Sequence, residues 1–216
     1  MNEEYLAETD VIRLCEPVFL DFVSRALEGA KASEAERASA LFLAVRDRII
    51  YDPYVPFFLP EHYTPGAVIA RGRGYCVMKA VLLCAACRKA GIPARLGFAE
   101  LQNRGAPAHV IAAMGTDIFA WHGFTEILLG GKWLKATPSF TADLCRRHNI
   151  APLAFDGTGN AVFPPFDLSG KPYAEYLEYH GSYADLPLDA ILAGWRKVYG
   201  NDTMDLWLAA FKQQGA

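Results

Sequence analysis

The chain has 216 residues, of which 52% are hydrophobic, enough to bury a core in one large domain. Its 21 basic and 24 acidic residues give a formal charge of -3, so we expect neither nucleic acid nor a membrane surface as its partner. No apolar run approaches the roughly 20 residues that span a bilayer. The number of cysteines, five, is odd, which favours free thiols over disulfides. Together with the polar, acidic N-terminus, it predicts a protein of the reducing cytoplasm.

The first part of the chain carries helix signals. Apolar residues recur at helical spacing over residues 17–30. Ser33 followed by Glu36 has the pattern of a capping box and predicts the start of a second helix. The segment 51–65 is rich in proline and aromatic residues, which predicts an ordered loop packed on the domain. Thr64 is positioned to cap a further short helix.

The longest helix is predicted over residues 76–90, and its few polar positions indicate that it lies at the centre of the fold. After this helix, the helical spacing of apolar residues gives way to short aliphatic and aromatic segments typical of strands. These are residues 94–101, 108–114, 119–129 and 132–137. Gly130 and Gly131 predict a hairpin between the last two. We therefore expect a single α+β domain over residues 1–216, with an antiparallel sheet packed on the central helix. Its core covers about residues 35–140, and a helical C-terminal extension follows over about 141–216.

Cys76 opens the predicted central helix, directly after the two glycines of "RGRGYC". A thiol in the first turn of a helix lies at the positive end of the helix dipole, near backbone N–H groups without partners, which favours the thiolate. Gly72 and Gly74 allow a sharp turn and close approach of a substrate. The same N–H groups would stabilise an oxyanion. The alternative is a small buried core residue, and position alone leaves both open.

A nucleophilic cysteine needs a base within hydrogen-bond reach. His122 is the best placed histidine, because strand alternation puts it on one face of a predicted strand that packs on the central helix. The alternative is a strand histidine that simply bonds a neighbour. His109, also in a predicted strand, is the second candidate, whereas His62, His148 and His180 are expected at the surface.

Cys84 and Cys87 have C-x-x-C spacing inside the central helix. No second C-x-x-C or H-x-x-H pair accompanies them, so we expect core packing and neither a metal nor a cofactor.

Several motifs lie in order along the chain: "GYC" at residues 74–76, "RKAGIPAR" at 88–95, "HGFTE" at 122–126 and "GKWLKATPS" at 131–139. This order resembles the core of the transglutaminase-like superfamily, whose papain-like members include proposed bacterial cysteine proteases. The resemblance implies Cys76 as nucleophile and His122 as general base and acid in acyl transfer from a peptide or amide substrate. It also implies an antiparallel sheet behind the helix that Cys76 opens.

The third member of the family's triad, an aspartate, falls on Thr137. A threonine hydroxyl accepts a hydrogen bond from an imidazole but does not offset the charge of an imidazolium. Three outcomes stay open: a Cys–His pair oriented by Thr137, an acid donated by Asp143, Glu126 or Asp117, or a catalytically silent relative.

Four residues around the two motifs are expected to contact substrate: Tyr75, Gly74, Arg73 and Trp121. Tyr75 and the aromatic loop could line a groove, and Arg73 with Arg71 could bind a carboxylate. Ordinary packing and a solvated loop are the alternatives.

Peptide or amide hydrolysis is the function that we expect first. Two other functions stay open. One is a non-catalytic peptide-binding or scaffolding domain, and the other is an acyl transfer similar to that of arylamine N-acetyltransferases, whose R-G-G-x-C motif "RGRGYC" partly matches. The oligomeric state is not predicted.

Overall fold

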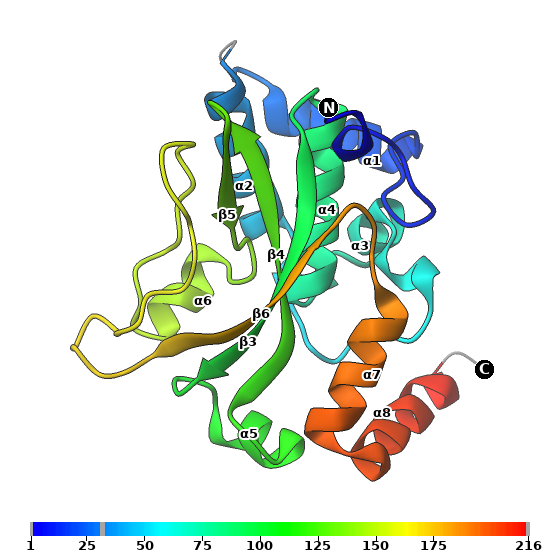
Figure 1. The fold of residues 1–216 in the computed structure, drawn as a ribbon, viewed down its shortest axis with the longest axis vertical. Helices are drawn as coiled ribbons and strands as arrows, with labels where there is room; N and C mark the ends of the chain where they lie inside the picture. The colour runs from blue at the N-terminus through cyan, green and yellow to red at the C-terminus, as the bar shows by residue number, and fades with distance from the viewer. Residues whose placement is uncertain (1, 31–32, 215–216) are drawn as a thin grey trace.

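The computed structural model describes residues 2–30 and 33–214 (Figure 1). Its helices are α1 (Pro17–Leu27), α2 (Glu34–Arg48), α3 (Pro65–Arg71), α4 (Cys76–Lys89), α5 (Ala108–Met114), α6 (Ala142–Arg147), α7 (Leu188–Tyr199) and α8 (Asn201–Gln214), with 3-10 turns η1 (Glu3–Tyr5) and η2 (Pro60–Tyr63). Its strands are β1 (Ile50–Tyr51), β2 (Arg73–Gly74), β3 (Ala94–Asn103), β4 (Ile118–Leu129), β5 (Lys132–Ala136) and β6 (Ala174–Tyr183). The last four form an antiparallel sheet in the order β5-β4-β3-β6, which confirms the α+β fold.

The helix caps of the N-terminal part follow from local sequence. The Ser33 hydroxyl accepts a hydrogen bond from the Glu36 N–H and donates one to the Glu36 carboxylate, which confirms that Ser33 begins the helix as its N-cap. The Thr64 hydroxyl caps α3 by accepting a hydrogen bond from the Ala67 N–H. Gly72 then adopts φ of 67°, which ends α3 and turns the chain into β2. This turn brings the chain to the first residue of α4 after only three further residues.

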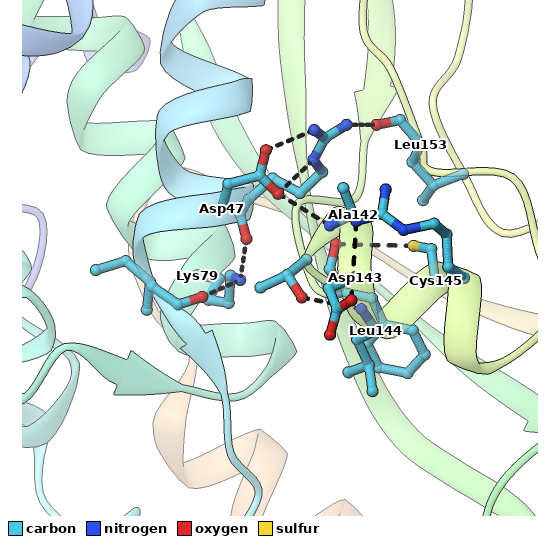
Figure 2. Close-up of polar contacts among 12 residues, drawn as sticks. Asp47, Lys79, Ala142, Asp143, Leu144, Cys145 and Leu153 are labelled. Carbon is cyan, nitrogen blue, oxygen red and sulfur yellow. Dashed lines mark hydrogen bonds and ion pairs between the residues drawn. The ribbon is translucent and has the colours of Figure 1, made fainter.

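Helix α4 is the centre of the molecule, because its residues from Cys76 to Arg88 are all buried. One of them is a lysine. The Lys79 ammonium donates to the carbonyls of Arg46 and Ile49, at 2.9 and 2.5 Å, and so caps the C-terminal end of α2 (Figure 2). The buried Lys79 amino group is therefore held by helix-end carbonyls, which carry the negative end of the α2 dipole.

Strand β4 lies directly on α4 through small and hydrogen-bonding residues. A Cβ added to Gly123 would lie 2.9 Å from the Val77 Cα, so only glycine allows this approach. The Thr125 hydroxyl donates to the Ala80 carbonyl of α4 at 2.9 Å. The register of the sheet and the first turns of α4 are thus fixed against each other.

Two predicted elements are wrong. Residues 108–114, expected as a strand, form α5, because Pro107 and a left-handed Gly115 bracket an alanine-rich run that favours a helix. The predicted helical extension begins with helix α6 but also contains a strand, β6, which pairs with β3 as an edge of the sheet. Its alternation is weak because an edge strand is largely solvated. The helical character of α7 and α8 is confirmed.

Within the described part of the chain, no helix combines the length and the apolar character needed to cross a membrane.

Candidate active site

Cys76 is the first residue of α4, after an extended Tyr75. Its side chain is buried, and the backbone N–H groups of Gly123 of β4 and of Val77 lie close enough to lower the pKa of its thiol. Burial nevertheless raises the pKa of the Cys76 thiol to about 11, against the lowering effect of these N–H groups. Desolvation of the thiol thus outweighs the backbone N–H groups that favour the thiolate.

Cys76 and Tyr75 line a cavity of about 280 Å³ whose remaining walls are mainly aromatic and aliphatic. These walls come from the loop after β1, from α5, from the start of β4, and from α7 and α8. The other lining residues are Tyr51, Pro53, Tyr54, Phe57, Val110, Ala113, Met114, Phe119, Ala120, Trp195, Tyr199, Trp207, Ala210 and Phe211.

His122 directly precedes Gly123 on β4, so the contact between Gly123 N–H and Cys76 brings the sulfur to the peptide that joins these two residues. The His122 ring is buried against Phe163 and Tyr176, with ring centroids 5.7 and 6.0 Å away. Its Nε2 atom has no hydrogen-bond partner. Burial lowers the pKa of His122 to about 3, so the imidazole is neutral.

The face of β4 that packs on α4 differs from the expected one. Gly123 and Thr125 face α4, whereas the His122 ring packs on the other cluster of buried residues, which includes Phe163. The ring also lies outside the set of residues that line the cavity. The Cys76 sulfur thus lies near the N–H of the peptide that follows His122, and Tyr176, which packs on the His122 ring, is also near enough to Cys76 for the thiol to affect its pKa.

Thr137 follows β5 and is fully buried. Its N–H donates to the Ala161 carbonyl at 2.8 Å, and its hydroxyl makes no hydrogen bond of good geometry. That hydroxyl lies close enough to the Tyr176 hydroxyl to lower its pKa, although burial raises the pKa of Tyr176 to about 12 overall. Tyr176, which also packs on His122, was not predicted, because it comes from the segment expected to be helical.

The three carboxylates considered as substitutes for the aspartate are each bound elsewhere. Glu126 accepts hydrogen bonds from Arg95, Tyr179 and Ser182, at 2.6, 2.8 and 2.7 Å. Asp117 accepts a bond from Gln102 at 3.0 Å, and Asp143 pairs with Arg147 on the exposed side of α6 at 2.6 Å.

The predicted substrate residues separate in the structure, and only Tyr75 lines the cavity. Arg73 is exposed and pairs with Asp52 at 3.1 Å. Gly74 is buried against the Met78 side chain. Trp121 stacks on the His180 ring at 4.6 Å and packs on α7, away from the cavity.

Other candidate residues of the sequence have ordinary positions. His109 is exposed on α5, so it does not lie on a strand. Cys84 and Cys87 are free and buried in α4, as expected for core residues. Among residues 2–30 and 33–214, no three histidine, cysteine, aspartate or glutamate side chains gather closely enough to hold a metal ion.

Comparison with solved structures gives distant similarities. A proposed cysteine protease from Cytophaga hutchinsonii is 16% identical, with a TM-score of 0.45, over 84% of this chain and 54% of that one. A TGase is 16% identical, with a TM-score of 0.42, over 57% of this chain and 31% of that one. The chain thus spans about half of the first and under a third of the second. No curated protein matches the sequence significantly.

The model of the transglutaminase-like superfamily matches residues 21–138, which is more than half of the 216 residues. This segment contains Cys76, His122 and Thr137, and it runs from α1 to the end of the β4–β5 hairpin. The chain therefore belongs to the transglutaminase-like superfamily.

Proposed function

We propose that the protein is a thiol-dependent acyl-transfer enzyme that hydrolyses a peptide or amide bond, with Cys76 as nucleophile and His122 as proton carrier. The observation that carries the proposal is the position of Cys76. It begins a central helix, contacts the N–H that follows His122, and opens into a cavity. A nucleophile needs this combination of backbone donors and access to a substrate.

The hypothesised reaction begins from a neutral pair. The Cys76 sulfur attacks the carbonyl carbon while its proton passes to His122, forming a carbon–sulfur bond and a tetrahedral oxyanion. His122 then gives the proton to the leaving amine, the carbon–nitrogen bond breaks, and water releases the acid and restores the thiol. The unpartnered Nε2 of His122 is consistent with a proton acceptor, since no resting hydrogen bond has to be broken.

This pair lacks a carboxylate at the position of the family's aspartate. Tyr176 packs on the His122 ring and Thr137 lies beside Tyr176, but hydroxyl groups leave the charge of an imidazolium unbalanced. The same observation favours a second candidate, a relative that binds peptides or amides without turnover.

Covalent trapping distinguishes the two. The protein is incubated with p-nitrophenyl esters, and the acylated residue is identified by mass spectrometry. We expect an adduct on Cys76 that Cys76→Ala abolishes and Cys84→Ala retains, because Cys84 is a buried thiol two turns further along the same helix. His122→Gln is expected to slow acylation at least about 100-fold, the typical contribution of a general base. His148→Gln, a half-buried histidine elsewhere, serves as its control.

If Cys76 stays unmodified by every ester while the protein remains folded, the enzymatic proposal is wrong and the non-catalytic alternative is favoured.

A further inference from the structure

The cavity at Cys76 offers few polar contacts. Of the described residues that line it, none carries a charged side chain. Its hydroxyl groups come from tyrosines, and some are already engaged. The Tyr75 hydroxyl is hydrogen-bonded to Tyr63, and the Tyr199 hydroxyl accepts the Ala120 N–H at 2.7 Å. A polar ligand in this cavity would leave most of its hydrogen-bonding groups without partners, which costs free energy.

Aromatic rings of the cavity wall hold one another in place. Phe57 contacts the rings of Trp195 and Phe211, with centroids 5.3 and 5.7 Å apart. Tyr199 contacts Trp207 at 5.4 Å. These contacts join the loop after β1 to α7 and α8, which meet in the lower part of the molecule (Figure 1). Helices α7 and α8 follow residues 21–138, so this part of the wall lies outside the segment that the family model matches.

We propose that this cavity selects the substrate by its acyl side, and that the acyl group bears a bulky apolar substituent such as an aryl ring. This inference rests on the proposed acyl transfer at Cys76. The substituent fills the aromatic cavity while the scissile carbonyl stays at the cavity wall, next to the Cys76 sulfur.

The size of the cavity agrees with such a group. A cavity of about 150 Å³ lined by apolar side chains holds a benzene molecule. The cavity here, at about 280 Å³, therefore has room for a ring and a short linker. A glutamine side chain is a poor occupant because it is polar, and a glycine residue leaves the cavity empty.

The proposal is tested with esters that share one leaving group. The p-nitrophenyl esters of 3-phenylpropanoate and acetate differ only in the apolar substituent. The esters of N-acetylphenylalanine and N-acetylglycine repeat the comparison with a peptide-like acyl group. A rate difference in this second pair would indicate a peptide substrate, and one in the first pair alone would indicate a non-peptide acyl group. Acylation of Cys76 is followed by nitrophenolate release and by intact mass. We expect the apolar acyl group to react at least about 10-fold faster in at least one pair, from burial of a phenyl ring.

A matched pair of variants locates the selectivity. Ala210→Trp fills the cavity from α8, and we expect it to reduce the rate ratio within the favoured pair to below about 2. Both alanines are exposed, but Ala209 does not line the cavity, so Ala209→Trp adds the same side chain to the same helix and we expect it to retain both wild-type rates.

Failure of the inference differs from failure of the proposed function. If the esters acylate Cys76 but neither pair differs in rate, the inference is wrong and acyl transfer stands. If no ester acylates Cys76, acyl transfer fails, and calorimetry of Cys76→Ala with unreactive 3-phenylpropanamide then tests the cavity. Binding that Ala210→Trp abolishes would support an apolar ligand, and absence of binding would overturn it.

Discussion

Replacement of Gly123 by alanine should separate the sheet from the central helix. The new Cβ would lie 2.9 Å from the Val77 Cα and 3.3 Å from its backbone nitrogen. Since carbon atoms normally pack at about 3.5–4.0 Å, β4 and α4 must part by roughly 0.6–1 Å. Rotation of the Val77 side chain, whose Cγ2 lies 3.1 Å away, does not remove the clash, because the nearest atom is the backbone Cα in the first turn of the helix. Overpacking of this kind costs about 1–3 kcal/mol.

Thermal unfolding and acylation of Cys76 measure the two consequences of Gly123→Ala. For a chain of this size the cost corresponds to a fall in Tm of about 2–12 °C. The shift also moves the Gly123 N–H away from the Cys76 sulfur, so we expect acylation to slow at least about 10-fold. Gly159→Ala is the control, because a Cβ there meets no atom within 4 Å. A Gly123→Ala protein with the Tm and rate of this control would refute the packing argument.

Three further predictions concern buried ionisable groups. His122 has a pKa of about 3 when folded against about 6.5 unfolded, so the unfolded chain binds more protons between these values. The free energy of unfolding should therefore fall as the pH drops from about 6.5 to 3, by up to about 1.4 kcal/mol per pH unit. In urea unfolding, the stability of His122→Phe should depend less on pH than that of the wild type. Identical pH profiles would contradict a buried neutral imidazole. Lys79 has a pKa of about 7, lowered by burial from 10.5, so wild-type stability should rise between pH 7 and about 10.5. Lys79→Met leaves the Arg46 and Ile49 carbonyls without a donor, at a cost of about 1–3 kcal/mol. The difference in unfolding free energy between wild type and Lys79→Met, measured in urea, should widen from pH 7 to 9.5. A difference that shrinks would refute the lowered pKa of Lys79. Alkylation of Cys76 by iodoacetamide, read by mass spectrometry, should accelerate up to about pH 11, and a plateau at neutral pH would show a resting thiolate.

Local signals in the sequence predicted the elements that local interactions stabilise. Ser33 and Thr64 cap helices through side-chain oxygens within three residues, so a short window of sequence contains the whole interaction. Gly130 and Gly131 adopt φ of 55° and 78°, as the predicted two-residue hairpin requires. The central position of α4 followed from its lack of polar residues.

Features that depend on distant segments could not be predicted in this way. The cavity is closed by helices α7 and α8, which are separated from Cys76 by more than 100 residues of chain. The neighbours of His122, Phe163 and Tyr176, come from the loop after α6 and from β6, and no pattern around His122 indicates them. The pKa of Cys76 likewise depends on its burial in the folded chain, which the sequence around it does not indicate.

Burial of Cys76 links its reactivity to the occupant of the cavity. The aromatic walls that we propose to select an apolar acyl group also disfavour a thiolate, since an isolated charge is costly in an apolar environment. Small polar electrophiles gain little from these walls and meet a protonated thiol. An apolar acyl group brings its carbonyl carbon to the sulfur and keeps water out, so that the proton can leave for His122 as the carbon–sulfur bond forms. Selectivity would then arise at the chemical step as well as in binding. The measurable consequence is that the apolar ester should exceed acetate in the maximal acylation rate, and not only in half-saturating concentration.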